Sequence, residues 1–108
     1  MTQKLVAALA ATCLALANEA TMAQGAPPDA QNGRALAERL CATCHAVVPE
    51  AAGGRPDVPS FLVIARMPNM TPERLAGAIV LPHPAMPDVA LTRAELRDII
   101  AYITSLKP

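Results

Sequence analysis

The sequence predicts an all-α fold, and three observations lead to that prediction. Apolar residues recur at helical spacing in the segments that begin near residues 30 and 92. Helix-capping residues precede several of the segments, and no stretch shows the pattern of a strand that competes with a helix. Prolines and glycines separate the segments. We therefore expect three to five short helices in one domain.

The first helix is predicted within 30–44, because its apolar residues share one face, namely Leu36, Leu40 and Cys44. A lead-in at 24–30 should be flexible, since it contains Gly25, Pro27 and Pro28. After the helix, 47–60 is expected to be an irregular loop, because it holds three prolines and two adjacent glycines.

Two short helices are expected next. Ser60 is the predicted N-cap of a helix that ends at Met67, because Pro68 follows it. Thr71 and Pro72 are a strong start for the next helix, which should run to about Leu81. A stiff, proline-rich loop then precedes the last helix.

The last helix begins at a predicted capping box formed by Thr92 and Glu95. Its apolar residues follow on one stripe, which consists of Leu96, Ile99, Ile100, Ile103 and Leu106. This helix should therefore bury one face against the rest of the domain.

The pentapeptide Cys41-Ala42-Thr43-Cys44-His45 points to a cofactor. A C-x-x-C-H sequence is the attachment motif of a c-type haem, in which both thiols form thioethers with the porphyrin and the histidine ligates its iron. The sequence thus predicts one covalent haem held by Cys41 and Cys44, with His45 as the axial ligand on one side.

Two other functions of a Cys-x-x-Cys pair do not suit this chain. A zinc site needs four ligands, and the remaining candidates are His83 and Cys13, which lies in a segment expected to be cleaved. A thioredoxin-like redox pair follows a strand in a βαβ unit, whereas this motif follows a predicted helix.

Residues 1–23 are predicted to be a secretory signal peptide. Lys4 provides a positive start, and Leu5–Ala17 is an uncharged apolar run of 13 residues. That length is short of the ~20 residues that span a bilayer. We expect cleavage between Ala23 and Gln24, with cleavage after Ala17 as the alternative, and hence a soluble periplasmic protein.

The composition of the mature chain argues against several partners. Without Lys4 and Glu19, eight basic and eight acidic residues remain of the nine and nine in the full chain, so the net charge stays zero. Haem propionates would add negative charge, which disfavours nucleic acid and stable membrane insertion or binding. About 85 residues with one Phe, one Tyr and no Trp make a marginal core, which a buried porphyrin would complete.

The second axial ligand is expected to be Met86, which lies in the proline-rich loop directly before the last helix. His83 in the same loop is the rival, and bis-histidine ligation would lower the reduction potential. Met67 is expected to fill the core and Met70 to lie at the surface. Thioether ligation by Met86 would favour ferrous iron and a high potential.

With Cys41-Cys44-His45 near its start, Met86 near its end and Ala101-Tyr102-Ile103 in the final helix, the chain resembles the class I cytochromes c, more closely the small bacterial periplasmic members. The similarity covers 33–106 and implies a cytochrome c domain over 31–108. It also implies that Gly33 and Tyr102 lie where the first and last helices cross. A proline carbonyl should bind the ligand histidine, with Pro59 the best fit and Pro56 the second.

The chain departs from the family pattern in three respects. Ala37 replaces an aromatic residue, so the helix crossing should be tighter or less stable. Tryptophan is absent, so a haem propionate would need another donor, for which Arg55 and Arg66 are candidates, although either can equally be a solvated surface charge. There is no lysine ring, so docking should depend less on salt and more on apolar contacts.

These observations and the resemblance predict a non-enzymatic, monohaem electron carrier with redox proteins as partners. It would pass single electrons between a dehydrogenase or quinol-oxidising complex and an oxidase or reductase, as a monomer or as a subunit of a redox complex. The alternative is a small-ligand-binding or peroxidase-like haem protein with an open distal site. Its acid and base could come only from His83 and Arg66.

Overall fold

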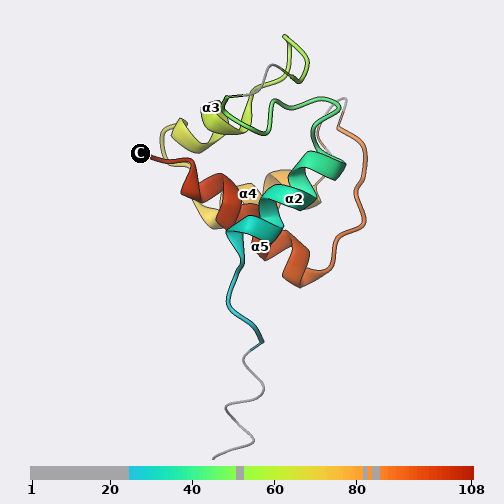
Figure 1. Cartoon of the computed structure of the whole chain (residues 1–108), viewed down its shortest axis with the longest axis vertical. Coiled ribbons are helices and arrows are strands. Elements are labelled where there is room, and N and C mark those ends of the chain that lie inside the picture. Colours follow the sequence, from blue (N-terminus) through green and yellow to red (C-terminus); the bar gives the residue numbers. More distant parts are fainter. Residues whose placement is uncertain (1–24, 51–52, 82, 84–85) are drawn as a thin grey trace, which may run out of the picture.

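A computed structural model describes residues 25–50, 53–81, 83 and 86–108. Within these residues the chain forms helices and no strand, and the helices are α2 (Ala30–Leu40), α3 (Phe61–Arg66), α4 (Pro72–Val80) and α5 (Arg93–Ser105). The predicted all-α class is therefore confirmed. Figure 1 shows α2 crossing α5 near the centre of the domain, with α3 to one side.

Each helix begins where a side-chain oxygen caps its first turn. Ser60, Thr71 and Thr92 accept backbone N–H bonds at the starts of α3, α4 and α5, as the sequence predicts. At α5 the capping box is complete, because the Glu95 side chain also accepts the Thr92 N–H at 2.8 Å. The N-cap of α2 is Asp29, which was not predicted from the sequence.

The first helix ends at Leu40, four residues before the end of the 30–44 segment that was predicted to contain it. Cys41 is the C-cap of α2, and the chain from Cys41 to Cys44 continues as a turn. The departure is local, since the Cys44 N–H donates at 3.2 Å to the Cys41 carbonyl three residues back and not to the carbonyl four residues back, as it would in an α-helix. The expectation that the motif lies at the C-terminal end of a helix is confirmed.

The crossing of α2 and α5 depends on small residues. A Cβ atom on Gly33 would overlap the backbone carbonyl of Asp98, so only glycine fits at this point. One turn further along α2, Ala37 has no exposed surface. The predicted position of Gly33 at the crossing is confirmed, and alanine in place of an aromatic residue accompanies a close approach of the backbones.

The core lies between α5 and the other helices, because α5 packs against α2, α3 and α4. Its buried apolar members come from every described helix and from the loop after the motif, and they are Leu36, Ala37, Val47, Phe61, Ala65, Leu75, Ile99, Tyr102 and Ile103. Ile99 and Ile103 belong to the predicted apolar stripe of the last helix, whose other members are partly buried.

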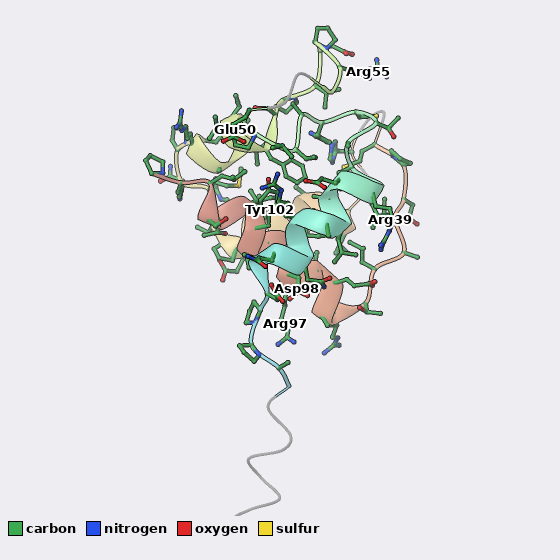
Figure 2. The ribbon with its side chains drawn as sticks, viewed as in Figure 1. Arg39, Glu50, Arg55, Arg97, Asp98 and Tyr102 are labelled. Atoms are coloured by element: carbon green, nitrogen blue, oxygen red, sulfur yellow. The ribbon has the colours of Figure 1, made fainter. Side chains whose placement is uncertain are left out.

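A polar network joins the described part of the lead-in to α5, at the lower end of the domain in Figure 2. Asp98 accepts the Asp29 N–H at 2.8 Å and the side-chain N–H of Asn32 at 2.8 Å. Arg97 donates to the Ala26 carbonyl at 3.3 Å. These bonds fix the start of α2 against α5. The flexibility of 24–30 and a domain boundary at residue 31 stay predictions.

No helix in the described part of the chain is long and apolar enough to span a membrane. The predicted signal peptide at 1–23 lies outside the described residues.

Replacing Gly33 by alanine should lower the free energy of unfolding by ~1–3 kcal/mol, because the added methyl group meets backbone that cannot move cheaply. Urea unfolding followed by circular dichroism measures this. Gly77→Ala is the matched control, since a Cβ there meets nothing within 4 Å, and alanine in a helix should stabilise by about 0.5–1 kcal/mol. Equal effects of the two substitutions would contradict the tight crossing.

The Asp98 network should make stability depend on pH in acid. The Asp29 N–H, the Asn32 amide and then Arg97 lower the pKa of the Asp98 carboxyl from its ordinary 3.8. A lowered folded-state pKa contributes stability that is present above pH 3.8 and is lost as the pH falls through the folded-state value. Asp98→Asn should therefore lower the free energy of unfolding at neutral pH. In strong acid, the variant and the wild type should have similar free energies of unfolding.

Urea titrations at several pH values test this, and Asp88→Asn, an exposed carboxylate outside the network, is the control. A difference in the free energy of unfolding between Asp98→Asn and wild type that stayed constant down to the lowest pH would show that protonation of Asp98 does not change stability.

Candidate functional site

The C-x-x-C-H motif forms a single turn directly after α2. Cys41 still donates its N–H to the Ala37 carbonyl at 2.8 Å, as a helical residue would, and its own carbonyl binds the N–H groups of Cys44 and His45. The two thiols and the imidazole are thus carried by five consecutive residues with a fixed backbone. This arrangement can present all three groups to one planar ligand.

Both motif cysteines are free thiols in partly buried positions. Burial raises the pKa of the Cys41 thiol, whereas the attacking cysteine of a redox pair has a lowered pKa. Among the described residues, no group of three or more His, Cys, Asp and Glu side chains could hold a metal ion. Within the described residues, the further ligands that a zinc centre needs are therefore not gathered around the two cysteines.

The imidazole of His45 is held by a hydrogen bond to the loop that precedes α3. Its Nδ1 lies 2.7 Å from the carbonyl oxygen of Pro59. Because a carbonyl only accepts, Nδ1 carries the proton and donates it, which leaves the lone pair on Nε2. This is the contact that the resemblance implies for Pro59, and it is the usual arrangement of a histidine that ligates a metal through Nε2.

The loop after the motif is bonded to it at two further points. Arg55 donates its backbone N–H to the Cys44 carbonyl at 2.8 Å, and Phe61 donates to the Ala46 carbonyl at 2.9 Å. Directly before Arg55, Gly54 adopts a φ of +77° and lies so close to the backbone after Cys44 that a Cβ would overlap the Ala46 nitrogen. The loop therefore wraps around His45 and holds its backbone on both sides.

Aromatic rings connect His45 to the core. The Phe61 ring lies 5.5 Å from the imidazole of His45 and 6.4 Å from the ring of Tyr102, tilted by about 50° to each. Tyr102 is buried, and its hydroxyl donates to the Val47 carbonyl at 2.7 Å. Desolvation raises the pKa of the Tyr102 phenol, so the donor is retained at neutral pH. Through this bond α5 holds the chain two residues beyond His45.

Met86 lies in the segment between α4 and α5. It is partly buried, and its N–H donates to the His83 carbonyl at 3.0 Å. His83 is exposed, and its Nδ1 donates to the Ala78 carbonyl at 3.1 Å. The two candidates for the second axial position are therefore part of one hydrogen-bonded segment, and each stays a prediction as a ligand.

The environments of Met67 and Met70 are the reverse of those expected. Met70 packs against the core, whereas Met67 is 36% exposed. The turn between them explains the exchange, because Asn69 has a φ of +59° and redirects the chain after α3. Met70 also accepts a hydrogen bond from the Lys107 ammonium group at its carbonyl.

Arg55 is engaged by a neighbouring acid. Its guanidinium forms an exposed ion pair with Asp57 at 2.9 Å, and Figure 2 shows Arg55 at the tip of the loop, away from α2 and α5. Asp57 in turn has a lowered pKa, first because it accepts the Arg55 hydrogen bond. Arg66 is exposed at the end of α3, so both arginines have the environment of surface charges in this structure.

Some residues that build the site were not singled out from the sequence. Phe61 and Val47 support His45 and the chain after it, and only the proximity of Phe61 to Pro59 in sequence could have suggested its role. The Asp57 partner of Arg55 could have been proposed from a spacing of two residues in a tight loop.

A small all-α domain whose first helix ends in a C-x-x-C-H turn, with the histidine bonded to a backbone carbonyl, has the features of a c-type haem domain. Comparison with known proteins agrees. Residues 28–103 match the family model described as cytochrome c oxidase, cbb3-type, subunit III. The chain is 45% identical to cytochrome c-552 of Bradyrhizobium diazoefficiens over 96 residues, which are 89% of this chain and 92% of that protein. No solved structure matches.

The chain therefore belongs to the class I c-type cytochromes, and its fold is the all-α cytochrome c fold. The predicted family is confirmed. Membership implies covalently bound haem c and a role as an electron carrier with redox proteins as partners, in a family that is generally non-enzymatic.

Tyr102→Phe should lower the free energy of unfolding by ~1–3 kcal/mol, because the Val47 carbonyl loses its buried donor while the ring remains. Denaturant unfolding of the haem-loaded protein measures the change. Tyr102→Leu, which also removes the ring, should cost more, and a Phe variant as stable as wild type would show that the hydroxyl does not hold this loop.

Proposed function

We propose that the chain is an exported, periplasmic cytochrome with one haem, in which His45 and Met86 are the axial iron ligands. Cys41 and Cys44 would hold the haem by adding their S–H groups across its two vinyl groups. The observation that carries the proposal is the 2.7 Å bond from His45 Nδ1 to the Pro59 carbonyl, because it leaves Nε2 free to ligate iron.

The haem supplies an iron that alternates between ferric and ferrous states when it is bound. The protein's own contribution is to hold the ligands. The carbonyl of Pro59 fixes the tautomer and ring orientation of His45 and increases its basicity. Phe61 limits rotation of the imidazole by packing against it. A thioether from Met86 on the other side would stabilise ferrous iron and raise the potential.

The partners follow from the absence of a dominant charge. The full chain has nine basic and nine acidic residues, and two exposed pairs among the described residues, Arg34 with Glu38 and Arg55 with Asp57, neutralise each other. We infer that docking depends on short-range apolar contact and weakly on salt. Fitting donors are a dehydrogenase or quinol-oxidising complex, and fitting acceptors are an oxidase or reductase.

The experiment that tests the ligands is the visible spectrum of the protein exported with haem-attachment machinery. The ferric form should show the weak far-red band of sulfur bound to iron. Met86→Ala should remove this band and lower the reduction potential, because a thioether favours the ferrous state. Met67→Ala is the control, since that methionine is exposed and should leave both quantities unchanged.

A wild-type protein without the far-red band, whose ferrous form binds carbon monoxide at once, would contradict Met86 ligation. The distal site would then be open, and the chain would be a ligand-binding or peroxidase-like haem protein instead of a carrier.

A further inference from the structure

The C-terminal end of α4 lacks one of its normal backbone donors. In a continued helix, the Ala78 carbonyl would accept the N–H of the residue four positions later. That residue is Pro82, which has no N–H. The Gly77 carbonyl accepts the Leu81 N–H at 2.9 Å. Ala78 is therefore the first residue of this helix end whose carbonyl needs a donor other than the backbone N–H four residues later.

His83 supplies the missing donor from its side chain. Its Nδ1 lies 3.1 Å from the Ala78 carbonyl oxygen, and because that oxygen only accepts, Nδ1 carries the proton. The imidazole thus takes the place of a backbone N–H and anchors the chain directly after α4 to the helix end. Side chains commonly satisfy such terminal carbonyls.

The same residue holds Met86 through its backbone. The Met86 N–H donates to the His83 carbonyl at 3.0 Å. The side chain of His83 is therefore fixed to α4 and its carbonyl is fixed to Met86. One residue connects the rigid end of a helix to the start of the segment that presents the methionine.

We propose that His83 is a positioning residue for Met86. The inference rests on the proposed ligation by Met86. The Nδ1 bond to Ala78 anchors His83 to the helix end, and the bond from the Met86 N–H to the His83 carbonyl joins Met86 to that anchor. Loss of the side-chain bond frees His83 from the helix and lets the thioether leave the iron more often.

Two substitutions separate the hydrogen bond from other effects of the residue. His83→Ala removes the donor. His83→Asn keeps a side-chain N–H at a position comparable to Nδ1 and should rescue the contact. Asp88→Ala is the control in the same segment, because Asp88 is exposed and has no side-chain hydrogen bond among the described residues.

The primary measurement is the rate at which cyanide binds the ferric protein, since cyanide must displace the thioether. His83→Ala should bind two- to fivefold faster, the equivalent of about 0.5–1 kcal/mol for one exposed hydrogen bond. The far-red band should also be lost at a lower urea concentration. His83→Asn and Asp88→Ala should match wild type. Unchanged cyanide binding in His83→Ala overturns the proposal.

A second measurement distinguishes failure of this inference from failure of Met86 ligation. Hydrogen exchange of the Met86 amide reports its bond to the His83 carbonyl directly, and His83→Ala should reduce the protection of that amide by the same two- to fivefold factor, whatever ligates the iron. Unchanged protection overturns the positioning role. A low-spin spectrum that survives Met86→Ala but is lost in His83→Ala would make His83 the ligand and overturn both proposals.

Discussion

The contact of α2 with α5 at Gly33 is the constraint on which the rest of the domain depends. Because a Cβ at this position would overlap the Asp98 carbonyl, the observed approach of the two backbones requires glycine here, and that approach sets the orientation of α5. The orientation in turn brings the Tyr102 hydroxyl to the Val47 carbonyl and its ring to Phe61. The support of His45 is thus determined by a glycine twelve positions before it in the chain.

The predictions that succeeded from sequence are those with a local chemical cause. Capping by Ser60, Thr71 and Thr92 follows from the reach of a side-chain oxygen to an N–H three residues later, so the helix starts could be read directly. The haem motif is equally local in the sequence, and haem binding by Cys41, Cys44 and His45 stays a prediction. Pro59 was named through resemblance, and the structure places its carbonyl 2.7 Å from His45 Nδ1.

The predictions that failed depend on backbone geometry that residue types do not specify. Met67 and Met70 exchanged environments because a non-glycine residue, Asn69, adopts a left-handed conformation between them. The first helix lies within its predicted segment, but its end at Leu40 depends on the Cys44 N–H bonding the carbonyl three residues back, which apolar spacing does not reveal. Contacts between distant segments, such as Asp98 with Asn32, needed the tertiary structure as well.

The packing of α2 on α5 has a consequence for the order in which the molecule is completed. The bond from the Asp29 N–H to Asp98 joins residues 69 positions apart, and α5 is the last helix to be synthesised. Contacts between such distant segments form late because a long loop must close first. Until α5 arrives, the motif stands at the end of a lone eleven-residue helix, too short to be stable in water. The thiols are therefore accessible for haem attachment until α5 packs onto α2, so closure of the fold can follow haem addition.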